Sequence, residues 1–346
     1  MYKIDSNFNI NKISPNLSIT DIDNNKKYDK IFIITEKRIN DLFSKHKIFD
    51  LGFHQITIND SKDIKTLHSV KLIINDLMNA NATRDSLLIG LGGGSISDIV
   101  GFIASIYMRG IDHVFMPTTL LGMVDASIGG KTGVDFLGVK NLVGTFKQPE
   151  GIIIDFHFLD SLDSNYIIDG FAEIIKYGLI FDKVFFDKVF KNFNSLINKN
   201  DFKEIIIQAC NYKIKTVLKD QFDQNQRMIL NFGHTVGHAL ETYFSNDKIS
   251  HGQAIYHGMI VESLVSLELG YLSKKDFQKI HDFLSSIITF PIKNVDEKAI
   301  YKLIKHDKKQ LRNKMHFVIL KQIGDSIIKS DVDPDVIINS IKKVLR

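Results

Sequence analysis

The segment Leu87-Leu-Ile-Gly-Leu-Gly-Gly-Gly-Ser-Ile-Ser-Asp98 decides the class of fold. It opens with a short apolar run, typical of a buried parallel strand, and three consecutive glycines follow before helical spacing sets in up to about Met108. Glycines at such a junction let backbone amides approach a phosphate, and the helix N-terminus adds positive partial charge. The third glycine of a strict dinucleotide fingerprint is absent, so a generic tight turn is the alternative to a phosphate-binding loop.

Strand and helix patterns alternate on both sides of this loop. Strands are expected at 30–36, 53–59, 114–117 and 151–155, and helices near 38–48 and 62–78. This alternation predicts a parallel α/β sheet with ligands at the carboxyl ends of its strands. Beyond about residue 160, long apolar-periodic segments predict helices over 163–181, 184–198, 203–219, 226–244, 252–270 and 274–288, with one hairpin at 316–320 and 326–329. We expect two domains, 1–160 and 161–346, the second mainly helical.

Composition limits the classes of protein. The chain has 346 residues, 44 basic against 40 acidic side chains and a net charge of +4. The basic residues are spread along the chain, which suits a small anionic substrate better than nucleic acid. A single cysteine excludes an intrachain disulfide and a thiolate-rich metal site. No apolar leader and no run of eighteen apolar residues occurs, so we expect a soluble cytoplasmic protein without membrane contact.

A histidine-rich stretch is the strongest chemical signal: Asn231-Phe-Gly-His-Thr-Val-Gly-His-Ala-Leu-Glu241, followed by His251-Gly-Gln. His234 and His238 are four residues apart and therefore share one helix face, with Glu241 on the same stripe. Such imidazoles and carboxylates suit a divalent metal with nitrogen and oxygen ligands. Spacing alone favours His238 as the partner of His234, and histidines that merely pack on a helix face are the alternative.

Other polar motifs flank these two segments. Gly129-Gly-Lys-Thr132 is not a P-loop, because the required first glycine is Asp125, so Lys131 is interpreted as a single anion contact. Glu173 and Lys176 are three apart on a predicted helix with apolar flanks, which allows either a surface ion pair or burial beside the histidines. Lys213, Asp220 and Arg227 recur at intervals of seven, so helices would bring them to roughly one side.

Taken together, the motifs resemble those of the 3-dehydroquinate synthases over residues 30–330. The resemblance is carried, in order, by 92–98, Tyr107-Met-Arg-Gly110, 117–121, 124–133, Lys140-Asn-Leu142, Ala172-Glu-Ile-Ile-Lys176, 230–238, His251-Gly252 and Asp307-Lys-Lys309. It implies a Rossmann-like NAD-binding α/β domain followed by a mainly α-helical metal-binding domain. It also implies conversion of 3-deoxy-D-arabino-heptulosonate 7-phosphate to 3-dehydroquinate and phosphate in the shikimate pathway, by transient oxidation with NAD, β-elimination, re-reduction and aldol closure.

The resemblance also implies roles for individual residues. The metal ligands, for zinc or cobalt, would be Glu173, His234 and His251, and His238 would face the substrate. NAD contacts would be Asp60, Ser61, Lys62, Asp63, Ile64, Lys65, Gly94, Ser95, Ile96, Ser97, Asp98, Thr118, Thr119, Lys131, Lys140, Phe158, Leu159, Asp160 and Ser161. Substrate contacts would be Asp125, Lys131, Asn141, Lys176, Lys213, Arg227, Asn231, His238 and either Lys308 or Lys309, of which we choose Lys309. Arg109 would reach the phosphate of a neighbouring subunit, which implies a homodimer.

Three positions depart from the family pattern. Lys62 replaces a glutamate near the cofactor ribose, Val139 a glycine before Lys140, and Gln253 a glutamate after His251-Gly252. A lysine cannot accept a hydrogen bond from a ribose hydroxyl, so Lys62 bears on cofactor affinity. The rival interpretations are another sugar phosphate cyclase, such as a 2-deoxy-scyllo-inosose synthase, and a metal-dependent polyol or alcohol dehydrogenase. A nucleic-acid-binding module rests only on the slight basic excess.

Overall fold

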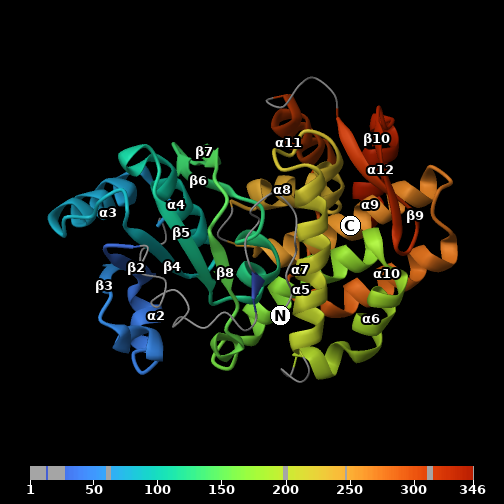
Figure 1. The fold of residues 1–346 in the computed structure, drawn as a ribbon. Coiled ribbons are helices and arrows are strands. Elements are labelled where there is room, and N and C mark those ends of the chain that lie inside the picture. Colours follow the sequence, from blue (N-terminus) through green and yellow to red (C-terminus); the bar gives the residue numbers. More distant parts are fainter. Residues whose placement is uncertain are drawn as a thin grey trace. The chain divides into compact units, whose positions relative to one another are not determined.

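The structure is a computed structural model that describes residues 13–14, 28–59, 64–197, 202–245, 248–309 and 315–345. The chain forms two compact units: residues 1–162 with 213–222 make unit 1, and residues 163–212 with 223–346 make unit 2 (Figure 1). A segment of the second half of the sequence, Lys213–Phe222, thus belongs to the first unit. The assignment of separate cofactor and metal domains to 1–160 and 161–346 stays a prediction.

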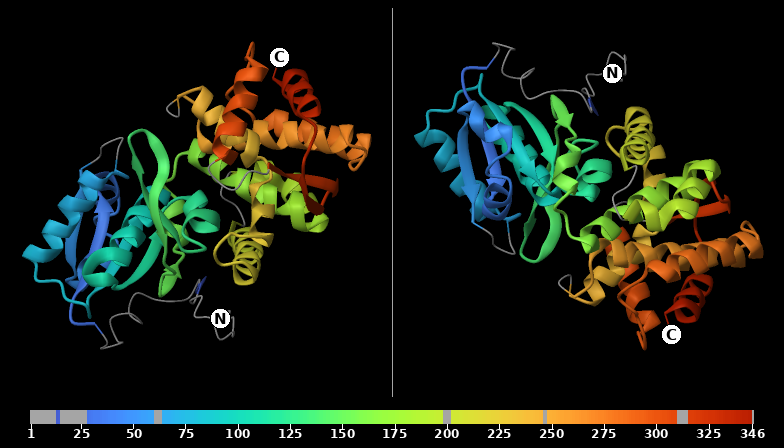
Figure 2. Two further views of the ribbon diagram at one scale, coloured as in Figure 1. Left: turned by 90° about the horizontal axis from the view of Figure 1, so that it is seen from above. Right: turned by 90° about the horizontal axis from the view of Figure 1, so that it is seen from below.

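Unit 1 is built on a parallel sheet, as the alternating pattern predicted. Its six strands have the order β1-β8-β5-β4-β2-β3, and every neighbouring pair is parallel. Figure 2 shows this sheet, in blue to green, from two further directions. The strands are β1 (Ile13–Ser14), β2 (Ile31–Glu36), β3 (His54–Ile58), β4 (Leu87–Gly92), β5 (Asp112–Pro117) and β8 (Gly151–Ile153). All six residues of β4 are buried, because this strand lies inside the sheet and is covered on its faces.

The glycine loop joins β4 to α4 (Gly94–Ile106) as expected, and α4 packs on β4 and β5. A Cβ added at Gly92 would lie 2.5 Å from the side chain of Ile96, so the turn into the helix has no room for another residue. The remaining helical elements of unit 1 are α2 (Lys37–Leu42), η1 (Lys47–Leu51), α3 (Leu67–Asn79), η2 (Tyr107–Arg109), η3 (Gly122–Ala126) and η4 (Phe156–Leu159). The single helix predicted near 38–48 is wrong, because α2 ends at Leu42 and η1 is a separate 3₁₀ turn.

A β-hairpin that the sequence did not predict follows η3. Its strands β6 (Lys131–Phe136) and β7 (Val139–Phe146) are antiparallel, and Gly133 pairs with Gly144. A Cβ at Gly144 would lie 2.3 Å from the backbone oxygen of Thr132, so the paired strands leave no room for a side chain there. Glycine is a weak strand former, and these two glycines concealed the hairpin from pattern analysis.

Unit 2 is mainly helical, as predicted. Its elements are α5 (Ser164–Phe181), α6 (Lys183–Ile197), α7 (Phe202–Lys219, whose last turns group with unit 1), η5 (Gln226–Asn231), α8 (His234–Tyr243), α9 (His251–Glu268), α10 (Lys274–Ile287), α11 (Glu297–Lys309), β9 (His316–Gln322), β10 (Asp325–Ser330) and α12 (Pro334–Val344). The hairpin β9–β10 is confirmed, whereas α11 and α12 were not predicted. One continuous helix over 226–244 is wrong, because Gly233 adopts a φ of 78° and separates η5 from α8.

Helices α8 and α9 cross at glycines. A Cβ on Gly258 would lie 1.9 Å from the backbone oxygen of Gly233, and one on Gly237 would lie 3.2 Å from the backbone oxygen of Ala254. Gly233 thus lies against Gly258, and Gly237 lies against Ala254, so the two helices are antiparallel. The backbones approach to contact distance because both sides of the crossing lack side chains.

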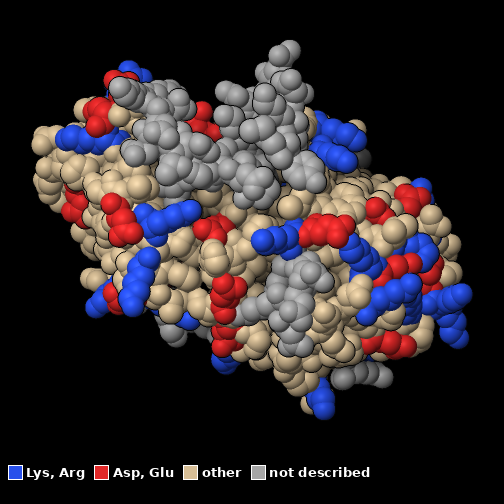
Figure 3. All heavy atoms as spheres, turned by 60° about the horizontal axis from the view of Figure 1, so that its bottom comes forward, with Lys and Arg blue, Asp and Glu red and all other residues tan. Residues whose placement is uncertain are grey.

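None of the described helices is long and apolar enough to cross a membrane. On the face drawn in Figure 3, basic and acidic side chains are intermingled, and the visible lysines and arginines do not form a continuous stripe.

The crossing yields a stability prediction. Gly258→Ala should destabilise unit 2 by at least about 2 kcal/mol, because the added methyl group meets backbone that cannot rotate away. The thermal denaturation midpoint should fall by several degrees. Glu268→Ala, an exposed change on the same helix, should leave the midpoint nearly unchanged. Equal midpoints for Gly258→Ala and wild type would contradict the close crossing.

Candidate active site

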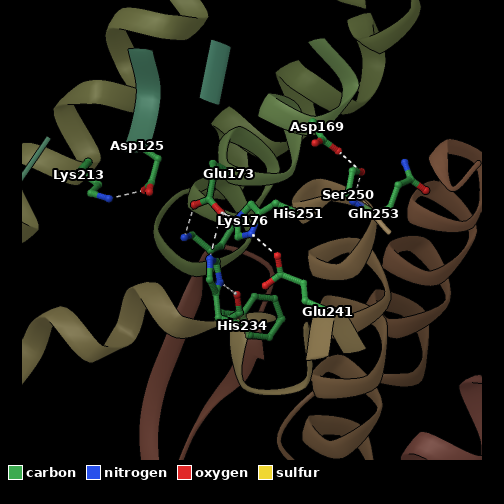
Figure 4. A network of polar contacts seen from close by, with 11 residues as sticks. Asp125, Asp169, Glu173, Lys176, Lys213, His234, Glu241, Ser250, His251 and Gln253 are labelled. Atoms are coloured by element: carbon green, nitrogen blue, oxygen red, sulfur yellow. Dashed lines mark hydrogen bonds and ion pairs between the residues drawn. The ribbon is translucent and has the colours of Figure 1, made fainter. Parts of the chain in front are cut away.

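Unit 2 brings one buried carboxylate and two partly buried imidazoles together. Glu173 comes from the middle of α5, and His234 and His251 are the first residues of α8 and α9 (Figure 4). The Nε2 atoms of His234 and His251 lie 3.2 and 3.5 Å from Oε1 of Glu173. One ligand atom from each residue falls within 4.8 Å of the others, so the three residues could hold a metal ion.

The second ring nitrogens of both histidines also have partners. Nδ1 of His234 lies 3.1 Å from the backbone oxygen of Phe232, and Nδ1 of His251 lies 3.6 Å from Oε1 of Glu241. An imidazole that donates from Nδ1 presents a lone pair at Nε2, as metal-ligating histidines do. The orientation of both rings therefore fits a cation beside Glu173.

Close packing of α9 on α5 brings two of these residues together. A Cβ on Gly252 would lie 2.5 Å from Cα of Asp169, so only glycine allows α9 to begin this close to α5. Ser250 caps α9 by accepting a hydrogen bond from the backbone N–H of Gln253, and its hydroxyl donates to Oδ1 of Asp169 at 2.5 Å. Glu173 lies one helical turn beyond Asp169 on α5, and His251 lies between Ser250 and Gly252.

A buried carboxylate from α9 holds the start of α8. Oε2 of Glu262 accepts the backbone N–H of Gly233 at 2.9 Å, and Oε1 accepts that of Val236 at 3.2 Å. Gly233 has no side chain with which to cap the helix, so Glu262 satisfies these amides from the neighbouring helix. The sequence analysis missed this residue, although a lone carboxylate within the apolar run 259–265 is a usable signal.

The electrostatics of the cluster suit a divalent cation. Glu173 is fully buried, and although burial raises the pKa of its carboxyl, Lys176 and His234 outweigh that effect and hold the pKa well below its usual range. Burial and the charge of Lys176 lower the pKa of His234, which keeps this imidazole neutral. Burial also lowers the pKa of His251, but the nearby carboxylates of Glu173 and Glu241 outweigh that effect and raise the pKa to about 10. Positive charge is therefore favoured beside two carboxylates.

The hydrogen bonding of Glu173 also fits a bound cation. Among the described residues, neither carboxylate oxygen of Glu173 has a hydrogen-bond partner of regular geometry, although both lie within ion-pair range of nitrogens. A buried carboxylate that is not fully hydrogen-bonded is costly unless a cation joins it. A second set, His238, Glu241 and His251, also has three ligand atoms within 4.8 Å of one another, but the side chain of His238 is exposed.

In unit 1, the glycine loop forms a cradle with polar groups around it. Gly93 precedes α4 without a side-chain cap, and a Cβ added at Gly94 would lie 3.1 Å from the side chain of Ala126. The hydroxyl of Thr118 is buried without a hydrogen-bond partner in the part of the chain that the structure describes. Open helix amides and an unsatisfied hydroxyl suit a phosphate or ribose group.

The other predicted cofactor residues are placed in part. Asp60, Ser61, Lys62 and Asp63 lie outside the described residues, so the effect of Lys62 stays a prediction. Lys65 forms an ion pair with Asp98 at 2.7 Å, and it also donates to Oδ1 of Asn141 on the hairpin. Of the remaining residues, the structure buries Ile64, Ile96, Ser97, Phe158 and Leu159, partly buries Thr119, and exposes Ser95, Lys131, Lys140, Asp160 and Ser161.

Models of two family domains match most of the chain: the 3-dehydroquinate synthase N-terminal domain at residues 55–169 and the C-terminal domain at residues 170–310. A 3-dehydroquinate synthase of Thermodesulfovibrio yellowstonii is 41% identical over 328 residues, which cover 91% of this chain and 89% of the relative. The chain belongs to the 3-dehydroquinate synthase family.

Solved structures agree with this family at the level of the fold. The 2-epi-5-epi-valiolone synthase ValA of Streptomyces hygroscopicus, solved with NAD⁺ and Zn²⁺, is similar with a TM-score of 0.85, 24% identity and coverage of 92% of each chain. A 2-deoxy-scyllo-inosose synthase in complex with carbaglucose-6-phosphate, NAD⁺ and Co²⁺ gives a TM-score of 0.79 at 21% identity and the same coverage. At these identities the likeness confirms the predicted fold and carries no residue roles.

The substrate residues expected of a 3-dehydroquinate synthase fall into both units. In unit 1, Lys213 forms an ion pair with Asp125, and the two side chains point toward each other in Figure 4. In unit 2, Lys176 and Arg227 are 1% and 3% exposed, and Lys176 forms an ion pair with Glu173. The structure leaves Asn231 partly buried and His238 and Asn141 exposed, and the side chains of Lys308 and Lys309 at the end of α11 lie outside the described residues.

Arg109 lies on a strained segment. Met108, Arg109 and Gly110 have φ values of 48°, 71° and 122°, and the first two carry side chains that disfavour positive φ. Arg109 is exposed at this turn. Strain of this kind is common where a side chain must be presented for binding.

The structure places the other two departures, Gln253 and Val139, and a further histidine of α9, His257. Oε1 of Gln253 accepts the backbone N–H groups of Thr289 and Phe290 at 2.8 and 3.1 Å, so this side chain holds the chain after α10. His257 is buried, and its Nε2 lies 2.9 Å from the backbone oxygen of Phe290, consistent with a packed residue. Val139 opens β7 after two residues of positive φ, Leu137 and Gly138.

The cluster predicts which histidines control metal content. His234→Ala and His251→Ala should each weaken zinc binding by more than the roughly 10- to 100-fold typical of outer-shell partners. His238→Ala should retain the metal. Zinc bound after dialysis against a chelator is the measurement, and His281→Ala on the exposed face of α10 is the control. Loss of zinc from both His238→Ala and His251→Ala, with none from His234→Ala, would favour the second set of ligands.

Proposed function

We propose that this chain is a 3-dehydroquinate synthase, a carbon–oxygen lyase that uses NAD and a divalent metal, zinc or cobalt, to convert 3-deoxy-D-arabino-heptulosonate 7-phosphate into 3-dehydroquinate and phosphate. Membership of the family supports the reaction, and the cluster of Glu173, His234 and His251 is the structural observation that carries it. The solved neighbours named above hold NAD⁺ with Zn²⁺ or Co²⁺, which supports the same pair of cofactors here.

In this proposal, Glu173, His234 and His251 hold the metal, and the loop before α4 with Thr118 holds NAD. When bound, the metal polarises a substrate oxygen as a Lewis acid and NAD accepts and returns a hydride. The ionised carboxylate of Glu173 and the neutral imidazole of His234 are in the protonation states that ligation requires.

The chain's own residues position an anionic substrate. Arg227 offers a buried guanidinium, whose fork of N–H donors fits a carboxylate or phosphate in two parallel hydrogen bonds. Lys176 is buried and forms an ion pair with Glu173. Lys213 is neutralised by Asp125, and an anionic substrate could take the place of that carboxylate. Charged side chains of this kind act by orientation and charge stabilisation.

Purified protein with NAD, zinc and the heptulosonate phosphate tests the proposal. Phosphate release and 3-dehydroquinate formation should be equal, with no net accumulation of NADH, because the cofactor is regenerated in each turnover. Net NADH formation from a polyol or alcohol, without phosphate release, would indicate a dehydrogenase instead. Phosphate release from a heptulose or hexose phosphate, with none from the heptulosonate, would indicate another sugar phosphate cyclase.

We further propose a homodimer in which Arg109 serves the site of the partner subunit. Its exposure and strained backbone support presentation of the guanidinium away from its own core. Arg109→Ala and Lys213→Ala should each be inactive alone. After subunit exchange their mixture should recover about a quarter of wild-type activity, because half of the dimers are mixed and each mixed dimer has one intact site.

Differently tagged copies, purified through both tags, would demonstrate the exchange. A mixture of two differently tagged Arg109→Ala proteins is the control and should stay inactive. Absence of recovery in proven mixed dimers would place Arg109 in its own subunit's site or in none.

A further inference from the structure

Glu241 lies behind one of the proposed metal ligands. Oε1 of Glu241 is 3.6 Å from Nδ1 of His251, while Nε2 of the same ring is 3.5 Å from Oε1 of Glu173. The two nitrogens are on opposite edges of the imidazole, so Glu241 and Glu173 contact it from opposite sides (Figure 4). The residue Glu241 is 7% exposed and lies outside the set of Glu173, His234 and His251.

Helix register explains why Glu241 reaches this position. Glu241 follows His234 by seven residues, which is about two helical turns, so both side chains lie on nearly the same face of α8. The antiparallel crossing places Gly233 against Gly258 and Gly237 against Ala254. Continued by one more turn, this register brings residue 241 opposite residue 250, which directly precedes His251.

The two histidines differ in the partner of their second nitrogen. His234 faces the neutral backbone oxygen of Phe232, whereas His251 faces a buried carboxylate. A carboxylate that accepts the Nδ1 proton fixes the ring and makes the opposite nitrogen a stronger donor to metal. A desolvated carboxylate is costly unless it is paired, so its burial at this point indicates a specific partner.

We propose that Glu241 is a positioning residue that accepts the Nδ1–H of His251 and thereby directs Nε2 of that histidine toward the metal. The proposal rests on the proposed function, because it requires a cation at Glu173, His234 and His251. Glu241 itself contacts neither the cation nor the substrate. Its removal should therefore weaken metal binding and change the ligand field while the ligands themselves remain.

The alternative is that Glu241 is itself a metal ligand, in the second set, together with His238 and His251. A nitrogen that donates a proton to Glu241 cannot also ligate a metal, so the two arrangements exclude each other at Nδ1 of His251. They also differ in the number of ions bound. One ion per chain fits the positioning role, and two ions per chain fit two ligand sets.

The test compares wild type with Glu241→Gln and Glu241→Ala in the full chain. Zinc affinity is measured by competition with a chelator, stoichiometry by direct metal analysis, and ligand geometry by the visible absorption of the Co²⁺ form. We expect about tenfold weaker zinc binding for Glu241→Gln, whose amide oxygen can still accept a hydrogen bond, and up to about 100-fold for Glu241→Ala. The Co²⁺ spectrum should shift in both variants, with one ion bound per wild-type chain.

Glu268→Gln is the matched control. Glu268 is an exposed carboxylate on α9 that forms a 2.6 Å ion pair with Lys343, and its change should leave zinc affinity and the Co²⁺ spectrum unaltered. Circular dichroism spectra measured with chelator present should agree for wild type and Glu241→Gln, since the amide is isosteric with the carboxylate. This measurement separates a loss of metal affinity from a loss of folding.

Three results would overturn the proposal. Equal zinc affinity and identical spectra in wild type and both Glu241 variants would remove the positioning role and leave the proposed function intact. Two ions per wild-type chain, with one lost in Glu241→Ala, would make Glu241 a ligand. Wild-type protein that binds no divalent cation would overturn the metal site, and with it both the proposed function and the role of Glu241.

Discussion

The closed crossing of α8 and α9 is the constraint on which the candidate site depends. Gly258 and Gly233 bring the two backbones together, and Glu262 of α9 accepts two amides at the start of α8. His234 is the first residue of that helix, so the same carboxylate that satisfies the amides also fixes the position of a proposed ligand. A capping side chain in the usual place, at residue 233, would collide with α9. The cap must therefore come from the neighbouring helix.

Close packing alone would not hold so many buried charges. Glu173, Lys176, Arg227 and Glu262 are each no more than 3% exposed. A buried charge is strongly destabilising unless an opposite charge or hydrogen bonds compensate it. Lys176 and the histidines compensate Glu173, and backbone amides compensate Glu262. Burying these charges lowers the stability of the fold. In the proposed function, the fixed charges orient an anion without reorganising water.

The sequence predicted those parts of the fold that follow from local patterns. The run of apolar residues in β4, the three glycines and the periodicity of α4 are adjacent in the chain, so their arrangement follows from short-range rules. The β6–β7 hairpin does not, because Gly133 and Gly144 are weak strand residues that become favourable only when the two strands meet. The break at Gly233 is likewise caused by α9, which supplies both the contact and the cap.

Local sequence patterns were also insufficient to predict the candidate metal ligands. On α8 alone, His234 and His238 are neighbours at helical spacing, and their ring centroids lie 5.2 Å apart. Yet His251, the first residue of the antiparallel helix α9, brings its ring to within 5.4 Å of the ring of His234. Residue spacing within one helix cannot predict the contact between His234 and His251. That contact depends on the antiparallel packing of α8 and α9 at Gly233, Gly237 and Gly258. The resemblance to a known family supplied His251 where spacing favoured His238. The glycines supply a physical reason, since the register that they set brings the start of α9, with His251, against the turn of α8 that carries Glu241.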